Sequence, residues 1–369
     1  MIDKGADFFR LLESIRIDKI DNRPLAEQLS PLSYWLASNI PTQLYRFLSS
    51  KSRNIEAFEK DQIWGSRPAT FNDPYECIPS YDTDYLDLSL QHALGINKKI
   101  QRFDDVENTQ NLSMMNLATK ESLCTIAELL NSNDFKKVLS TDRAAFINRI
   151  MPWWKECYEE IAQEFTEYFI SNRQEQYITC LSEKRDETLM WAHYADSHKG
   201  FCLEYDMREY MTSKDKSNIS NCKPIIGPVH YSSHRFDATS LVIDMLESKL
   251  KSTLNIDNPT YLSDDMLSFK CLLIKSDVWK YEKEWRLFTF NPTAGIDEDH
   301  RIQAIYKPKA LFIGARMEQK TANVLQEICD QKNIPCYKMI QTFASKTYTF
   351  EPILYREYIE NSNSRVYGI

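Results

Sequence analysis

Residues 280–290 read Lys280-Tyr281-Glu282-Lys283-Glu284-Trp285-Arg286-Leu287-Phe288-Thr289-Phe290, a run in which two glutamates precede alternating aromatic and aliphatic side chains. Side chains two apart on a β-strand point to the same face. The pattern therefore predicts that Glu282 and Glu284 direct two carboxylates into one cleft, where such a pair can orient a ribose hydroxyl and stabilise a sugar cation. The alternative is a solvated, charged turn that leads into the strand.

The composition is that of a globular protein. The chain has 369 residues, of which 43% are hydrophobic and 12% aromatic, enough for a sizeable core in one elaborated domain or two. Residues 1–10 lack the apolar centre of a signal peptide, and no run of about 18 apolar residues occurs, which predicts a cytoplasmic protein that does not span a membrane. The net charge of −8 disfavours broad, non-specific binding to nucleic acid or anionic membrane but is compatible with a local basic groove.

Cysteines and histidines give no sign of a metal site. The nine cysteines are scattered, odd in number and include no Cys-x-x-Cys pair, so we predict no disulfide framework, no bound metal and mostly buried thiols. His193 and His198 are five apart, a spacing that does not stack two imidazoles on one helix face. His193 is therefore expected to pack or hydrogen-bond near a cleft.

Hydrophobic periodicity predicts an α+β fold in which helical segments interrupt a sheet. Strand patterns occur on both sides of residues 85–175, which lack strand alternation and carry aromatic residues at helical spacing. We expect a split core with a mixed or antiparallel sheet. The predicted units are an N-terminal helical collar (1–43), the first part of the core (44–84), a helical insertion (85–175), the second part of the core (176–345) and a C-terminal tail (346–369).

Common catalytic motifs do not occur in the chain. It contains no Gly-x-Gly-x-x-Gly, no P-loop, no His-Glu-x-x-His and no Gly-x-Ser-x-Gly, so nothing points to the usual nucleotide-binding, zinc-protease or serine-hydrolase sites. With only eight glycines, a Gly-rich loop that cradles phosphate is not expected.

Several groups of residues, taken in order, carry a resemblance to a known family. They are Leu44-Tyr45-Arg46-Phe47, Trp64-Gly65-Ser66-Arg67-Pro68 with Phe71-Asn72-Asp73-Pro74, Cys180-Leu181-Ser182-Glu183 with Met190-Trp191-Ala192-His193-Tyr194 and Lys199-Gly200-Phe201, and Glu282-Lys283-Glu284-Trp285-Arg286. They resemble the ordered motifs of the bacterial family catalogued as domain of unknown function 2971, across residues 44–80 and 177–340. That family has no settled activity, so the resemblance by itself implies no chemistry.

A second resemblance suggests a reaction. An Arg on a first strand, a Ser on a middle strand followed by a helix, and a Glu-x-Glu entering a later strand are similar to the Arg-Ser-Glu layout of NAD-dependent ADP-ribosyltransferases. The resemblance implies that Arg46 binds the phosphates or ribose of NAD, because a guanidinium matches phosphate bidentately. Ser182 would hold the nicotinamide ribose or back the catalytic carboxylate. Glu284 would bond the ribose 2′-hydroxyl and stabilise the oxocarbenium-like state, and Glu282 would position or deprotonate the acceptor.

The same resemblance implies an aromatic wall for the cofactor cleft. Tyr45, Trp64 or Tyr194 would stack on the nicotinamide ring, as aromatic faces do on flat cations. Ser66 belongs to the segment that shapes the cleft in that superfamily, and His193 would lie beside it.

Each of these roles has a structural alternative. Arg46 could form an ion pair within the fold, Ser182 could cap the helix that follows it, and Arg286 could simply pair with Glu284. The middle strand reads Leu181-Ser182-Glu183 instead of the Ser-Thr-Ser of many Arg-directed enzymes, which leaves the role of Ser182 open.

We therefore expect an NAD-consuming ADP-ribosyltransferase-like enzyme or NAD glycohydrolase, with NAD as substrate and a macromolecular acceptor, in a bacterial defence or toxin system. Arg46, Ser182 and Glu284 are expected to line one pocket. One alternative is a non-catalytic module that recognises a nucleotide or a nucleic-acid end in the same cleft. Another is a metal-dependent nuclease that uses Asp73, Glu76 and Glu284.

The helical insertion is expected to cover one edge of the pocket and to select the acceptor. Replacing its basic residues Lys98, Lys99 and Arg102 should then alter acceptor modification more than NAD hydrolysis. Proportional loss of both activities would mean that the insertion only stabilises the fold.

Overall fold

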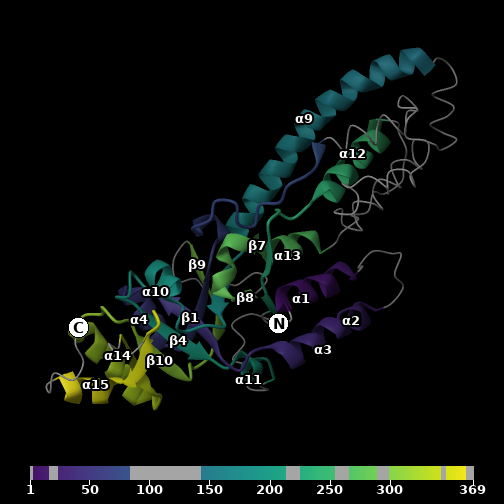
Figure 1. Ribbon diagram of the computed structural model, residues 1–369. Helices are drawn as coiled ribbons and strands as arrows, with labels where there is room; N and C mark the ends of the chain where they lie inside the picture. The colour runs from purple at the N-terminus through teal and green to yellow at the C-terminus, as the bar shows by residue number, and fades with distance from the viewer. Residues whose placement is uncertain are drawn as a thin grey trace.

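The protein has an α+β fold built on one mixed sheet, as the sequence predicts (Figure 1). The computed structural model describes residues 3–15, 24–83, 143–212, 225–253, 266–288, 299–341 and 346–362. In this part of the chain the 10-stranded sheet runs β12-β11-β10-β4-β1-β3-β2-β9, with β8 pairing β3 and β5 pairing β8. Its strands are β1 (Leu44–Leu48), β2 (Gln62–Ser66), β3 (Ile178–Ser182), β4 (Phe201–Tyr205), β5 (Ile225–Pro228), β8 (Glu284–Phe288), β9 (His300–Ile305), β10 (Ala310–Ile313), β11 (Cys336–Ile340) and β12 (Glu351–Leu354). A separate parallel pair joins β6 (His230–Ser232) and β7 (Ile274–Ser276).

The sheet divides at β3, and this division creates the space for the site. One edge of β3 pairs along its whole length with β8. On the other edge, β1 pairs at Ser182 through Tyr45, and β2 pairs at Ile178 through Ser66. The strand residues between these two pairings form no ladder on that edge, so β1 and β2 diverge around the middle of β3. We call this opening the fork.

Helices cover both faces of the sheet, because successive strand residues point to opposite sides. Leu44 of β1 packs in one hydrophobic core with Leu325 of α14. Phe47 packs in a second core against Trp191 of α10, with ring centroids 5.2 Å apart. The helices are α1 (Lys4–Glu13), α2 (Leu25–Gln28), α3 (Ser30–Asn39), α4 (Ser52–Glu59), η1 (Pro68–Thr70), α9 (Arg143–Glu175), α10 (Thr188–Tyr194), α11 (Met207–Thr212), α12 (Thr239–Thr253), α13 (Leu267–Leu272), η3 (Asp277–Glu282), α14 (Gln319–Lys332) and α15 (Tyr355–Ser362).

The end of the expected insertion is a long helix. In Figure 1, α9 extends away from the sheet with α12 beside its lower part. Phe165 of α9 lies in one hydrophobic core with Leu246 of α12 and Phe8 of α1, and Lys249 pairs with Glu160 at 2.6 Å. The N-terminal helices α1 and α3 therefore share a hydrophobic core with α9 and α12. Lys98, Lys99 and Arg102 lie outside the described residues, so their predicted role stays a prediction.

The described part of the expected C-terminal tail (346–369), residues 346–362, adds a strand to the sheet and a helix. Ile353 of β12 pairs with Lys338 of β11, and α15 follows directly. Among the described residues, no helix combines the length and the apolar character needed to cross a membrane.

Candidate functional site

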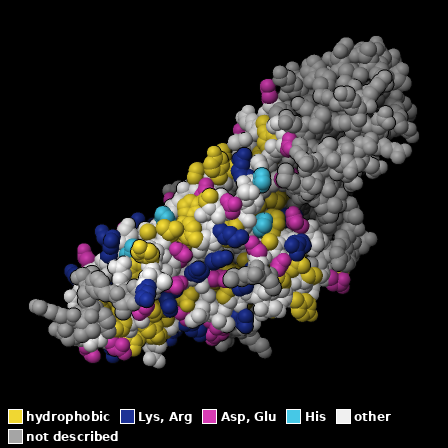
Figure 2. Space-filling model, viewed as in Figure 1, with side chains coloured by type: hydrophobic (Ala, Val, Ile, Leu, Met, Phe, Trp, Pro, Cys, Tyr) yellow, Lys and Arg dark blue, Asp and Glu magenta, His cyan; other side chains and the backbone are white. Residues whose placement is uncertain are grey.

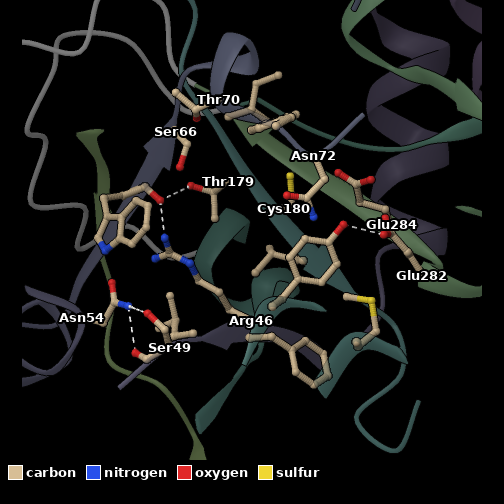
Figure 3. Close-up of a pocket in the computed structure, with 18 of the residues that line it drawn as sticks. Arg46, Ser49, Asn54, Ser66, Thr70, Asn72, Thr179, Cys180, Glu282 and Glu284 are labelled. Atoms are coloured by element: carbon tan, nitrogen blue, oxygen red, sulfur yellow. Dashed lines mark hydrogen bonds between the residues drawn. The ribbon is translucent and has the colours of Figure 1, made fainter. Parts of the chain in front are cut away.

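A cavity of about 250 Å³ opens at the fork. Strands β1, β2 and β3 form its walls together with α10, β7 and the head of β8, and we call it the fork cavity. Arg46, Trp64, Ser66, Tyr194, Glu282 and Glu284 all line it, so six of the residues expected at the site share one space. Figure 3 shows Arg46 on one side of this cavity and the two glutamates on the other.

The two glutamates converge, although not for the reason that the strand pattern suggested. Strand β8 begins at Glu284, whereas Glu282 ends η3, and Lys283 between them adopts a left-handed conformation with φ of 48°. The simple alternation of a strand therefore does not apply to the pair. Both side chains are buried, with 2% and 3% exposed, so the alternative of a solvated turn is wrong.

Lys275 holds the pair together. Its Nζ donates to Oε2 of Glu282 at 2.7 Å and to Oε2 of Glu284 at 2.9 Å, and it lies 3.5 Å from Oε1 of Glu76. Burial lowers the pKa of Lys275, but the charges of Glu284 and Glu282 outweigh it and hold this pKa well above its ordinary value. The Lys275 ammonium therefore stays charged and lies between the carboxylates of Glu282 and Glu284.

Arg286 fixes Glu284 from the opposite side. Its Nε donates to Oε1 of Glu284 at 2.8 Å, while Nη2 lies 3.4 Å from Oε2 and also pairs with Glu76. The expected alternative, in which Arg286 pairs with Glu284, is confirmed. Both oxygens of Glu284 therefore carry charged donors, which makes this carboxylate a rigid anion.

Glu282 is the more adaptable carboxylate. Its Oε1 accepts a hydrogen bond from the Tyr194 hydroxyl at 2.7 Å, and its Oε2 faces Lys275. Burial, followed by the nearby charge of Glu284, raises the pKa of Glu282 from 4.5 to about 7. A carboxyl with this pKa can take up and release a proton at neutral pH.

Arg46 is a buried cation without an anion. The residue is 5% exposed, and its guanidinium donates from Nη2 to the Trp64 carbonyl at 2.6 Å and lies 4.2 Å from the centroid of the Trp64 ring. No carboxylate of the described residues lies within ion-pair distance of it, so the structural ion pair considered as an alternative is not formed. Burial lowers its pKa from 12.5 to about 10, so the group remains charged at neutral pH. An unpaired buried charge is unfavourable unless a ligand neutralises it.

Arg46 and Glu284 reach the cavity from opposite faces of the sheet. Tyr45 pairs with Ser182 and Ser182 pairs with Glu284, so these three side chains share a face that Arg46, one residue along, does not. Both nevertheless line the fork cavity, so of the three residues expected to share one pocket Arg46 and Glu284 do, whereas Ser182 does not. The side chain of Thr179 also reaches across the fork, because its Oγ1 donates a hydrogen bond to the Trp64 carbonyl of β2 at 2.8 Å.

Three expected site residues do not line the fork cavity. Ser182 is fully buried behind it and donates from Oγ to the Glu282 carbonyl at 2.6 Å, which supports the glutamate without reaching a ligand. It also accepts a hydrogen bond from the Lys184 backbone at 3.0 Å, as the capping alternative suggested. Tyr45 does not line the cavity and packs with its ring centroid 6.1 Å from that of Phe312. His193 is exposed, and its ring lies 6.2 Å from that of Trp279.

Trp64 and Tyr194, the two expected stacking residues that line the cavity, already contact other side chains. The Trp64 ring carries Arg46, and the Tyr194 hydroxyl is bonded to Glu282. Burial raises the pKa of Tyr194 well above its ordinary value, so the hydroxyl remains a donor. The sequence did not predict these contacts. Both residues line the cavity, so they remain placed beside a bound ligand.

Sequence reasoning missed Lys275 and Cys180. Lys275 follows the apolar run Cys271-Leu272-Leu273-Ile274, and a single charge at the end of such a run is a signal that could have marked it as buried. Cys180 is open to the cavity but enclosed by protein, and burial together with Glu284 raises the pKa of its thiol well above the usual value. It is therefore a neutral thiol at physiological pH.

The carboxylates considered for a metal-dependent nuclease already form hydrogen bonds or ion pairs with other side chains. Asp73 accepts from Trp279 Nε1 at 3.0 Å, and Glu76 and Glu284 are paired with Lys275 and Arg286. Within the described ranges, no group of three His, Cys, Asp or Glu side chains is placed to hold a metal ion. This arrangement disfavours the nuclease.

Residues 190–287 match the family model described as a protein of unknown function, DUF2971. The match contains α10 from Met190 onward, Lys275 and both glutamates, whereas β1 and β2 precede it. The predicted resemblance to this family is confirmed for residues 190–287, whereas the expected motifs in residues 44–80 lie outside the match. No curated protein and no solved structure matches the chain.

Replacing Lys275 with Met should destabilise the protein by about 3–5 kcal/mol, because three buried carboxylates would lose their shared cation. Urea unfolding followed by circular dichroism measures this change. Lys280→Met is the matched control, since its exposed pair with Asp3 at 3.3 Å should contribute less than about 1 kcal/mol. Equal losses in the two variants would contradict the role assigned to Lys275.

Proposed function

We propose that the protein consumes NAD, cleaving it in the fork cavity and transferring ADP-ribose to a macromolecular acceptor or to water. The observation that carries the proposal is a single cavity with an unpaired buried guanidinium, Arg46, on one side and the carboxylates Glu282 and Glu284 on the other. NAD has the complementary groups, namely phosphates, ribose hydroxyls and a cationic nicotinamide ring. The reaction type comes from the similarity of these positions to those of ADP-ribosyltransferases.

The fixed charges suit the cleavage of the bond between ribose and nicotinamide. As C1′ of the ribose loses nicotinamide, the bonding electron pair leaves with the ring, which becomes neutral, and positive charge develops on the sugar. Glu284, held rigidly by Lys275 and Arg286, would stabilise that charge without reorganising. Arg46 would bind a phosphate and so replace the anionic partner that it lacks in the protein.

Glu282 would serve the second half of the reaction. An O–H or N–H group of the acceptor, or a water molecule, attacks C1′ to form the new bond and gives its proton to the Glu282 carboxylate. The raised pKa of Glu282, about 7, fits it for taking this proton and releasing it to solvent. The hydrogen bond from Tyr194 orients the carboxylate toward the cavity.

A second candidate is a non-catalytic module that binds a nucleotide in the same cavity. One observation favours it, because both oxygens of Glu284 are engaged by Lys275 and Arg286. A ribose hydroxyl would have to share an oxygen with one of these donors. The module would bind NAD through Arg46 and release no nicotinamide.

The steady-state rate of ADP-ribose transfer to the acceptor or to water at saturating NAD should rise with pH through about 7, because only the ionised form of Glu282 accepts the proton of the attacking group. We expect an increase of about tenfold per pH unit below the pKa and a plateau above it. Glu282→Gln should lower the plateau and abolish this dependence. A profile that is unchanged in the variant would exclude Glu282 as the base.

The same group should make folding stability depend on pH. The pKa of Glu282 is raised from 4.5 to about 7 in the folded protein, so the native state binds the proton more tightly. Its contribution is fully present below pH 4.5 and is lost as the pH rises through 7, a change of about 3 kcal/mol. The difference in free energy of unfolding between Glu282→Gln and wild type should therefore shift in favour of the variant from pH 5 to pH 8. Parallel curves would contradict the raised pKa.

A further inference from the structure

A second, larger cavity of about 620 Å³ adjoins the fork cavity. Its walls come from residues 72–78, 232–236 and 274–279, and we call it the loop cavity. Asn72, Glu76 and Lys275 line both cavities, so the carboxylate cluster stands between them. A molecule seated in the loop cavity would therefore lie next to the groups that are proposed to cleave NAD.

The carboxylates of the loop cavity are neutralised within the protein. Asp73 accepts hydrogen bonds from Trp279 Nε1 at 3.0 Å and from the Tyr75 backbone at 2.8 Å. Glu76 pairs with Lys275 and Arg286. Neither acid is left with free charge to attract a basic group.

One aromatic and one basic side chain of the loop cavity, Tyr75 and Arg235, are exposed. Tyr75 is 66% exposed, and the guanidinium of Arg235 lies 5.7 Å from the centroid of its ring. In the described part of the chain, Arg235 has no carboxylate within ion-pair distance. The exposed His234 and the hydroxyl of Ser233 lie beside it along the same loop. The cavity thus offers a flat ring, a free cation and a hydroxyl within one loop cluster.

We propose that the loop cavity is the acceptor site and that it receives a segment of single-stranded nucleic acid. A base stacks on Tyr75, and Arg235 contacts the adjoining phosphate. Stacking on an exposed aromatic ring together with a nearby guanidinium is the combination that recognises unpaired nucleotides. The inference rests on the proposed function, because it supplies the macromolecule to which ADP-ribose is transferred.

The charge distribution favours a nucleic acid over a basic peptide. A basic peptide would need free carboxylates, whereas those of the loop cavity are already paired. Acidic and basic side chains are interspersed over the visible face in Figure 2, which fits a contact confined to one cavity better than an extended basic surface. The overall charge of −8 likewise requires that binding be local.

The test is fluorescence anisotropy with a labelled 12-nucleotide single-stranded DNA and its RNA counterpart, using the full chain. Tyr75→Ala and Arg235→Ala should each weaken binding at least tenfold, consistent with a lost stacking or phosphate contact. Matched controls are Tyr348→Ala and Arg316→Ala, an exposed tyrosine and an exposed arginine that do not line the cavity. The controls should bind like wild type, and Tyr75→Ala should hydrolyse NAD at the wild-type rate.

The outcomes separate this inference from the proposed function. No binding of either oligonucleotide by wild type, or equal effects in site and control variants, would overturn the nucleic-acid site. Transfer of labelled ADP-ribose to added proteins without competition from the oligonucleotide would also overturn it, in favour of a protein acceptor. Oligonucleotide binding that depends on Tyr75 and Arg235, without any release of nicotinamide, would support the site while contradicting the proposed enzyme.

Discussion

Replacing Arg46 with Met should weaken NAD binding about 100-fold without destabilising the protein. Arg46 is buried without an anionic partner, so its removal relieves an uncompensated charge while the apolar side chain keeps much of the volume. The Trp64 carbonyl keeps its hydrogen bond from Thr179 at 2.8 Å. We expect an unchanged free energy of unfolding or a gain of up to about 2 kcal/mol. Isothermal titration calorimetry and urea unfolding measure the two effects.

Arg286 provides the matched control for this prediction. It is also fully buried in a strand, but it pairs with Glu284 and Glu76. Arg286→Met should therefore cost about 3–5 kcal/mol of stability, because two carboxylates would remain buried without it. If Arg46→Met destabilises the protein as much as Arg286→Met does, Arg46 is a structural residue and the ligand site lies elsewhere.

Replacing Glu284 with Gln should lower the rate of nicotinamide release at least about 100-fold while NAD affinity changes by less than about threefold. The amide keeps the size of the carboxylate but lacks the charge that is proposed to stabilise the developing sugar cation. Nicotinamide release is followed by chromatography and affinity by calorimetry. Because Lys275 and Arg286 lose a partner, the measurements belong at a temperature where unfolding curves show the variant folded.

Glu183→Gln is the control for Glu284→Gln. Glu183 follows β3 and accepts a hydrogen bond from Trp285 Nε1 at 2.8 Å, but it does not line the fork cavity. Its variant should release nicotinamide at the wild-type rate. Similar losses in both variants would indicate a general effect on β8 instead of a role for the Glu284 charge.

The sequence predicted the fold class and the meeting of Glu282 and Glu284, because these depend on local patterns. The alternation of Trp285 and Leu287 marks β8, and the head of that strand carries the pair. The sequence could not predict the left-handed Lys283, since nothing in its residue type requires φ of 48°. The meeting of Glu282 and Glu284 was therefore predicted correctly, although strand alternation is not its cause.

The contacts that tune the site depend on long-range packing. Lys275 reaches the glutamates from β7, and Glu76 reaches Arg286 from a loop more than 200 residues earlier in the chain. Whether Arg46 has an anionic partner also depends on which segments surround the fork. Ser182 and Tyr45 share a strand face with Glu284 but do not line the cavity, because Ser182 donates to the Glu282 carbonyl and Tyr45 packs against Phe312. Periodicity alone does not reveal these contacts.

The central claim is that the fork cavity cleaves NAD, and the most direct test is nicotinamide release by the wild-type protein. NAD labelled in the nicotinamide ring is incubated with the protein at pH 8, with and without single-stranded nucleic acid. We predict release well above the rate without protein, and its loss in Arg46→Met. Absence of release under both conditions, with NAD still bound, would contradict the enzyme and leave the non-catalytic module. Release that persists in Arg46→Met would place the cleavage site outside the fork cavity.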